Sequence, residues 1–169
     1  MKFAAELRTD VVIVRSGRIP AEADTLAMSR MVESLTALGA YGERIGVRLA
    51  LQTADASPQD LARLLAALPE QSTGIDLYPS GLIIAGYSPR EAVESLGPHV
   101  LHVHACDAVR DIASRQGVEV ELGRGAADFP ELLGRLTEFD YRGWVTIERR
   151  ESANPIAEVE NAVEFLASL

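Results

Sequence analysis

The chain has 169 residues, the size of one domain with a substantial hydrophobic core, and we expect a single domain over residues 1–169. Hydrophobic residues make up 47% of the chain and charged residues 24%, a balance typical of an ordinary soluble globular protein. The net charge of −9 and the lack of a Lys/Arg cluster disfavour nucleic acid as a partner.

Cysteine content and hydropathy favour a cytoplasmic location. A single cysteine rules out an internal disulfide and fits a reducing environment. The first residues are too charged for a signal peptide, and no apolar run approaches the roughly 18 residues that a membrane span needs. We therefore expect a cytoplasmic protein with no membrane partner.

Strand and helix signals alternate through the first half of the chain. Asp10–Val14 is an apolar, β-branched run, as in a strand buried on both faces. Apolar residues at mostly helical spacing follow over Ala21–Leu38, and Gly46–Gln52 is the second expected strand. A Ser-Pro start signal at Ser57 opens the next helix, and Thr73–Tyr78 gives a third, weaker strand signal.

The alternation continues through the second half. Ser88–Gly97 has the start and stop signals of a helix, and Val100–Asp107 is a buried strand. Asp128–Glu138 is the next helix, and Gly143–Glu148 is the last strand. Asn154 and the proline after it begin a final helix with one apolar stripe. Such alternation indicates a mostly parallel sheet with right-handed crossovers.

Two strand ends carry chemically capable side chains. His104 and Asp107 follow one strand, and Glu148 ends another. Because ligands bind at the carboxyl ends of parallel strands, an imidazole and a carboxylate converging there predict a metal or acid/base site. The longest irregular stretch, 107–128, lies next to it, and long loops in compact domains tend to carry function.

Several motifs occur in an order that is shared with a known family. They are Gly86-Tyr87-Ser88-Pro89, His102-Val103-His104-Ala105-x-Asp107, Gly123-Arg124-Gly125-x-x-Asp128-Phe129 and Tyr141-Arg142-Gly143-Trp144-Val145-Thr146-Ile147-Glu148. Together they resemble the xylose isomerase-like TIM barrel superfamily, which contains sugar isomerases, ketose 3-epimerases and the AP endonuclease 2 group. The resemblance runs from about Asp10 to the last residue.

The resemblance implies an incomplete barrel. The family barrel has eight strands and usually needs roughly 250 residues. This chain corresponds to strands 4–8, with Met1–Arg8 matching the end of the preceding helix. We therefore expect an α/β, parallel-stranded partial TIM barrel of about five β/α units. Because open edges expose unpaired backbone and apolar surface, we expect completion by homo-oligomerisation or by a rearranged sheet.

The family's metal-ligand positions are only partly retained. By resemblance, strand ends supply a Glu, an Asp, a His and a Glu, which fall here on Gln52, Tyr78, His104 and Glu148. A divalent ion (Mn, Mg or Zn) is implied at His104 and Glu148, with Gln52 and Asp76 as further candidates. Asp76 points to the same face as Tyr78 but lies about 6–7 Å further back along the strand.

Other candidates concern substrate binding. The resemblance places a substrate-binding arginine at Arg110, and His102, Asp107 and Arg124 are further candidate contacts. Each has an alternative: His102 as a packed, hydrogen-bonded side chain, Asp107 as the residue that fixes the following loop, and the turn around Arg124 as a plain glycine turn. Cys106 has no indicated base partner and is expected to be a passive thiol.

The resemblance implies a sugar isomerase or epimerase acting on a small sugar or polyol. Glu148 is the candidate catalytic carboxylate, and Gln52 replaces the second one, so two-sided proton transfer lacks a base and we expect impaired activity. Tyr78 could also fill the vacated metal space, and Arg149 and Arg150 could pair with Glu148. The alternatives are a non-catalytic ligand- or partner-binding homologue and a barrel fragment with a role in folding or assembly.

Overall fold

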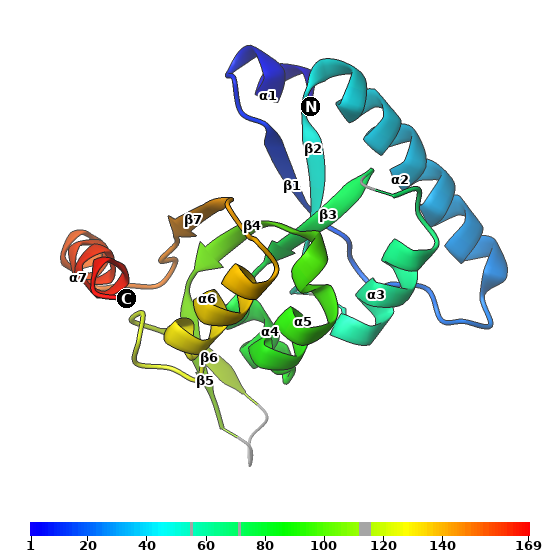
Figure 1. Cartoon of the computed structure of the whole chain (residues 1–169). Helices are drawn as coiled ribbons and strands as arrows, with labels where there is room; N and C mark the ends of the chain where they lie inside the picture. The colour runs from blue at the N-terminus through cyan, green and yellow to red at the C-terminus, as the bar shows by residue number, and fades with distance from the viewer. Residues whose placement is uncertain (55, 71, 112–115) are drawn as a thin grey trace.

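The computed structural model describes residues 1–54, 56–70, 72–111 and 116–169. Its main element is a five-stranded parallel sheet in the order β1-β2-β3-β4-β7. The strands are β1 (Val11–Arg15), β2 (Arg48–Gln52), β3 (Thr73–Leu77), β4 (Val100–Ala105) and β7 (Trp144–Ile147). The strands form half of a barrel, as Figure 1 shows, which confirms the predicted partial TIM barrel. In the described residues the sheet ends at β1 and β7 and does not close on itself.

Eight helical segments, counted over the described residues, accompany this sheet. They are α1 (Lys2–Glu6), α2 (Thr25–Ile45), α3 (Pro58–Ala66), α4 (Pro79–Ala85), α5 (Pro89–Leu96), the 3-10 turn η1 (Gly97–His99), α6 (Phe129–Glu138) and α7 (Pro155–Ala167). In Figure 1, α3, α5 and α6 lie side by side, α2 runs beside β2 and β3, and α7 lies beyond β7.

The core lies between the sheet and the middle helices. Its largest fully buried side chains come from the strands and from α3, α4, α5 and α6: Leu49, Leu51, Leu61, Leu64, Ile75, Leu77, Leu82, Val93, Leu96, Phe129 and Leu136. Burial of this kind contributes about 25 cal/mol for each Å² of apolar surface removed from water. The sheet strands are therefore held firmly from one side, and their ends are well-fixed platforms for polar side chains.

The helix starts predicted from Ser57, Ser88 and Asp128 are confirmed. Each side chain accepts a hydrogen bond from the backbone N–H three residues later, at 3.1, 3.3 and 3.1 Å. Each is followed by a helix with proline in its first turn, where the missing N–H costs nothing. Asn154 also precedes a helix, but its side chain makes no capping hydrogen bond.

The helix expected over 21–38 is longer than its apolar pattern. It runs through two glycines to Ile45 and ends at Gly46, whose φ of 72° is left-handed. A Cβ on Gly39 would lie 2.6 Å from the Ser72 carbonyl oxygen, and one on Gly42 would lie 2.1 Å from the Val47 carbonyl oxygen. These glycines therefore let α2 approach the loops that lead into β2 and β3.

Two elements were not predicted. The stretch expected to be irregular contains an antiparallel pair, β5 (Asp107–Arg110) and β6 (Gly117–Val120), while residues 112–115 lie outside the described ones. The short helix α4 starts at Pro79 and ends at Gly86, whose φ of 90° is left-handed. Seven residues are too few for a periodic signal, so only these terminal residues indicated α4.

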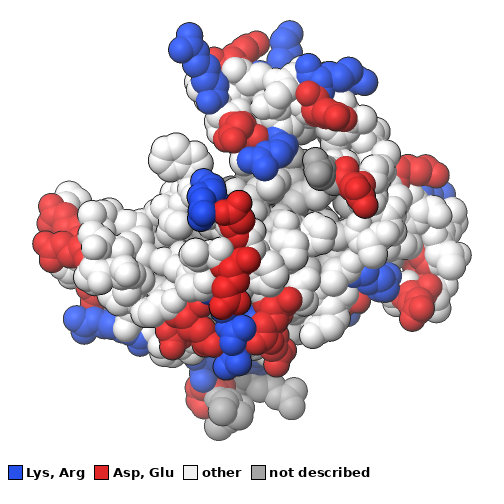
Figure 2. Space-filling model, viewed as in Figure 1, with Lys and Arg blue, Asp and Glu red and all other residues white. Residues whose placement is uncertain are grey.

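The outer helical surface carries paired charges. Arg90 bonds Glu94 and Glu131, and Arg135 bonds the same two carboxylates, at 3.0–3.3 Å. Figure 2 shows these acidic and basic groups gathered over α5 and α6. This surface is a solvated one.

Both ends of the half-barrel leave apolar side chains exposed. Trp144 of β7 is 74% exposed, and in α7 Ile156 and Val163 are 73% and 52% exposed. At the other end, Phe3 and Leu7 near α1 are 69% and 63% exposed. The apolar stripe predicted for α7 thus exists, with Ile156 and Val163 exposed and Leu166 packed against the core. None of the described helices is long and apolar enough to cross a membrane.

Candidate functional site

The site is built around one buried carboxylate, Asp76, near the end of β3. Its Oδ1 lies 2.8 Å from Nδ1 of His102 and 2.9 Å from Nδ1 of His104. Gln52 of β2 donates from Nε2 to Asp76 Oδ2 at 3.1 Å. The parallel register puts Gln52 beside Asp76 and Asp76 beside His102, so all these side chains lie on one face. Asp76, two residues before Tyr78 along the chain, therefore contacts both histidines.

The environment keeps Asp76 ionised. Burial alone would raise its pKa, but hydrogen bonds from His102, His104 and Gln52 together outweigh that effect and lower the pKa below the usual value. The side chain has no exposed surface. A fully buried carboxylate must be compensated by donors or cations, and His102, His104 and Gln52 provide the donors here.

His102 is bonded at both ring nitrogens. Its Nε2 lies 2.8 Å from Oγ1 of Thr146 on β7, and its Nδ1 contacts Asp76. The His102 and His104 rings meet edge to face, with centroids 4.8 Å apart. This is the packed, hydrogen-bonded arrangement that the sequence offered as the alternative to a substrate contact.

His104 and Glu148 converge as their strand ends predicted. His104 Nε2 lies 3.5 Å from Glu148 Oε2, across the β4–β7 pair. The other oxygen of Glu148, Oε1, accepts a hydrogen bond from Arg150 Nε at 2.6 Å. Oε2 itself is buried and has no hydrogen-bond partner among the residues that the structure describes. Such an orphaned acceptor costs free energy unless a donor or cation reaches it, so it marks a place where a ligand can bind.

Tyr78 occupies the space beside His104. Its ring lies edge-on to His104 with centroids 5.3 Å apart, and the Arg150 guanidinium lies 5.1 Å above the same ring. The ring fits because position 81 is glycine: a Cβ there would lie 2.4 Å from Tyr78 Cδ1. Burial raises the pKa of Tyr78, so its phenol stays neutral at physiological pH.

Asp107 organises the loop and does not reach the cluster. Its Oδ1 accepts from the backbone N–H groups of Ala108 and Ala127 at 2.8 and 2.9 Å. Its Oδ2 accepts from those of Gly123 and Gly125 at 3.2 and 2.8 Å. The backbone N–H groups at both glycines of the 123–125 turn are therefore used by an anion of the chain itself. Asp107 has the loop-fixing role that the sequence gave as its alternative.

The two candidate arginines lie apart from the cluster. Arg110 packs its guanidinium against Gly86, where an added Cβ would lie 1.5 Å from Nη1. Arg124 is exposed and bonds Glu121 at 2.8 Å. In the described part of the chain no hydrogen bond or ion pair joins either arginine to the Asp76 cluster, so their substrate-binding roles stay predictions.

Cys106 is chemically passive, as expected. It accepts a hydrogen bond from Ser80 Oγ at 3.0 Å and is buried. Burial raises the pKa of its thiol to about 12, so almost none of it is thiolate at neutral pH.

The sequence analysis overlooked Thr146 and Thr53. Thr146 faces the site two residues before Glu148, so the period-2 alternation of β7 was the signal that placed it there. Thr53 follows β2 and accepts the Tyr78 backbone N–H at 2.9 Å. Arg150, and not Arg149, pairs with Glu148, because Arg149 is bonded to Glu119 and Glu158.

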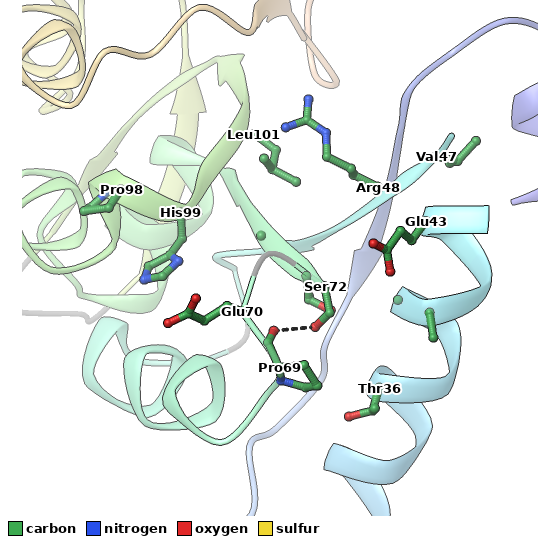
Figure 3. A pocket seen from close by; sticks show the side chains of 14 residues that line it. Thr36, Glu43, Val47, Arg48, Pro69, Glu70, Ser72, Pro98, His99 and Leu101 are labelled. Carbon is green, nitrogen blue, oxygen red and sulfur yellow. Dashed lines mark hydrogen bonds between the residues drawn. The ribbon is translucent and has the colours of Figure 1, made fainter. Parts of the chain in front are cut away.

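A separate cavity of about 760 Å³ opens at the amino ends of β2, β3 and β4, beside α2. Figure 3 shows Glu43, Arg48, Glu70 and His99 around it. Because these groups lie at the opposite strand ends from Glu148, the cavity is not part of the Asp76 cluster.

The fold and site together define a partial (β/α) barrel with polar groups at the carboxyl ends of its strands. The chain belongs to the xylose isomerase-like TIM barrel family, whose model matches residues 1–169. A solved xylose isomerase domain protein from Planctomyces limnophilus is similar to it, with a TM-score of 0.90 and 25% identity. That match covers 99% of this chain and 62% of the other.

Two curated relatives are also similar. An uncharacterized protein of Methanocaldococcus jannaschii is 26% identical over 96% of this chain and 58% of its own length. The inosose dehydratase of Geobacillus kaustophilus is 26% identical over 55% of this chain and 36% of its own length. The chain thus spans less than two thirds of the length of these relatives.

The divalent ion implied by the family does not fit the family positions in this chain. Gln52 turns its amide nitrogen inward to Asp76, and Tyr78 offers a neutral phenol where a carboxylate is implied. Glu148 is already paired with Arg150. Mg²⁺ and Mn²⁺ prefer several hard, charged oxygen ligands, so His104 and Glu148 alone form a poor site for them.

Proposed function

We propose that this protein is an isomerase/epimerase-like member of its family that binds a small sugar or polyol at the carboxyl ends of β4 and β7 and has impaired turnover. The observation that carries this proposal is the convergence of His104 Nε2 and Glu148 Oε2, 3.5 Å apart, with Oε2 buried and unpartnered. A ligand hydroxyl that donates to Oε2 would satisfy that orphaned acceptor.

The chemistry around this pair suits a polyhydroxylated ligand. Glu148 offers an acceptor, while Arg150, whose side chain is half exposed, offers N–H donors next to it. A hydroxyl group both donates and accepts, so adjacent hydroxyls can use both groups at once. Tyr78 supplies a flat apolar surface alongside. Similarity to a xylose isomerase domain protein and to an inosose dehydratase supports the same class of ligand.

The same contacts argue against efficient epimerisation or isomerisation. Moving a proton from one side of a carbon to the other requires a base on each side. Gln52 has no basicity, and Asp76 is fully buried and already accepts hydrogen bonds from its neighbours. Glu148 is the remaining carboxylate at these strand ends, and its Oε1 already accepts a hydrogen bond from Arg150.

An assembly role is the second candidate, favoured by the open sheet edges. The exposed Trp144 and the exposed α7 stripe suit a protein that completes its barrel with another copy of itself. A reducing cytoplasm suits the single buried thiol of Cys106 in either case.

Ligand-observed NMR with D-xylose and myo-inositol tests the main proposal. We expect weak binding of at least one of them, a roughly tenfold loss in Glu148→Gln through the missing charge-assisted hydrogen bond, and no detectable conversion of D-xylose. Glu160→Gln on the exposed side of α7 is the matched control and should bind like the parent. Equal binding by Glu148→Gln, or no binding of either compound, would refute the proposed site.

A further inference from the structure

The cavity beside α2 is a second place in the molecule with room for a small molecule. Its volume of about 760 Å³ lies within the range of roughly 300–1,000 Å³ that is usual for ligand pockets. It opens at the amino ends of β2, β3 and β4, and neither Asp76 nor Glu148 contributes to its walls. Its ligand must therefore be inferred from its own lining.

The wall of this cavity contains a buried hydroxyl group without a partner. Thr73, the first residue of β3, lines the cavity and is only 6% exposed. Among the described residues, its Oγ1 has no hydrogen-bond partner. A buried polar group of this kind costs free energy, which a ligand recovers when it donates a hydrogen bond to it. This hydroxyl is the observation that points to a ligand here.

The charged groups around the cavity leave it acidic. In Figure 3, Glu43 of α2 lies on one side, and Glu70, in the loop between α3 and β3, lies on the other with His99. Within the described part of the chain, the two carboxylates make no hydrogen bond or ion pair. Arg48, the one arginine or lysine in the described lining, already bonds Asp10 at 3.4 Å. The uncompensated charge is therefore negative, like the net charge of −9 of the chain, and attracts cations.

Apolar surface lies among these charged groups, which excludes a bare ion as the best ligand. It is provided from α2 and from the loops before the strands by Ala40, Val47, Pro69, Pro98 and Leu101. An inorganic cation leaves such surface in contact with water, whereas a carbon chain covers it. The one cluster of metal-ligating side chains in the described residues lies elsewhere, at the carboxyl ends of the strands.

We infer that this cavity binds a short aliphatic diamine or polyamine, a carbon chain with an ammonium group at each end. One ammonium group pairs with Glu43 and the other with Glu70, while the methylene groups cover the apolar wall. An ammonium group has three N–H donors, so one of them is available for Thr73 Oγ1. The inference does not depend on the proposed sugar site, because the two sites share no residue.

An NMR titration of the ¹⁵N-labelled full chain with 1,4-diaminobutane and 1,6-diaminohexane tests the inference at low salt. We expect shifts confined to amides around the cavity, among them those of Ala40, Gly74 and Leu101. Binding should weaken as salt is added, because both carboxylates are exposed and salt screens exposed charges. We expect 1-aminohexane, with the same carbon chain and one charge, to bind more weakly than 1,6-diaminohexane.

Charge variants separate a specific site from general attraction to an acidic protein. Glu43→Gln and Glu70→Gln should each weaken diamine binding by about two- to fivefold, the usual effect of one exposed ion pair. Glu160→Gln removes the same charge from the exposed surface of α7, outside the cavity lining, and is the matched control. It should bind the diamines like the parent.

Thr73→Val provides a readout that a purely structural threonine would not give. The substitution keeps the branched shape and removes the unpartnered hydroxyl, so the unliganded variant should resist urea better than the parent. The same variant should bind 1,6-diaminohexane about two- to tenfold more weakly, because the hydrogen bond to Oγ1 is lost.

Three results would overturn the inference. Shifts spread over the acidic surface, with equal losses in Glu70→Gln and Glu160→Gln, would show attraction by net charge alone. Equal binding of 1-aminohexane and 1,6-diaminohexane, or a Thr73→Val variant that binds like the parent, would contradict the assigned contacts. Absence of binding at low salt would refute the site itself.

Discussion

At the scale of the residue, the central feature is a buried carboxylate, Asp76, that is hydrogen-bonded to two histidine rings. Asp76 has no exposed side-chain surface and accepts hydrogen bonds from both histidines and from Gln52. Sequence reasoning located His104 and Glu148, because strand ends can be read from the alternation of elements. It did not predict that Asp76 contacts both histidines, because contact between side chains on neighbouring strands depends on register, which a single sequence does not give.

The lowered pKa of Asp76 predicts an acid-sensitive fold. A carboxyl whose folded pKa lies below its unfolded value, about 3.9, contributes stability above that value, and the contribution is lost as pH falls through the folded pKa. Asp76→Asn should therefore lose ~1–3 kcal/mol at pH 7, with a smaller deficit at pH 3. Urea unfolding in chelator at both pH values measures this, and an equal deficit at both would contradict it.

The changed ligand positions predict a gain of function. Gln52→Glu combined with Tyr78→Asp restores the carboxylates that the family pattern implies, next to His104 and Glu148. We expect the double variant to bind Mn²⁺ or Mg²⁺ at millimolar concentrations, with each single variant weaker, because hard cations require several charged oxygen ligands. Calorimetry is the measurement, and no gain would mean that the ancestral geometry is lost.

At the scale of the element, helices and strands were predicted correctly where the signal came from residues close together in the sequence. Ser57, Ser88 and Asp128 each opened a helix, because capping uses only neighbouring residues. The hairpin of β5 and β6 was missed, since its strands are four residues each and it depends on antiparallel pairing across a loop. The end of α2 was misplaced because glycine normally indicates a helix end, whereas Gly39 and Gly42 serve close packing here.

The packing of α2 predicts opposite effects for two glycine substitutions. Gly42→Ala should destabilise the protein by ~1–3 kcal/mol, because its Cβ would lie 2.1 Å from the Val47 carbonyl oxygen. Gly134→Ala in α6 meets no atom within 4 Å and should stabilise by ~0.5–1 kcal/mol through helix propensity. Urea unfolding of both variants compares them, and a neutral Gly42→Ala would contradict the close approach.

At the scale of the whole molecule, the half-barrel has two open edges. The match of TM-score 0.90 covers 62% of a longer chain, so this chain keeps the backbone arrangement of a barrel segment instead of adopting a rearranged one. The unpaired edges of β1 and β7, with Trp144 and the α7 stripe exposed beside β7, are the kind of surface that association buries.

We propose that a homo-oligomer covers these edges in solution. All the strands of the sheet are parallel, so β7 of one copy can pair with β1 of another around a symmetry axis that runs along the strands. Sedimentation should therefore give a closed oligomer, and Trp144→Lys should shift it towards monomer. The matched Arg142→Glu change, close to Trp144 in sequence, should leave it unchanged. A monodisperse monomer of the unaltered chain would contradict the proposal.

The most direct test of the account is a crystal structure of the protein grown with D-xylose or myo-inositol. The account predicts ligand density at the carboxyl ends of the parallel neighbours β4 and β7, with a hydroxyl within hydrogen-bond distance of Glu148 Oε2. Ligand density confined to the cavity beside α2 would contradict it. So would a structure in which the ends of β4 and β7 diverge and His104 and Glu148 are not neighbours.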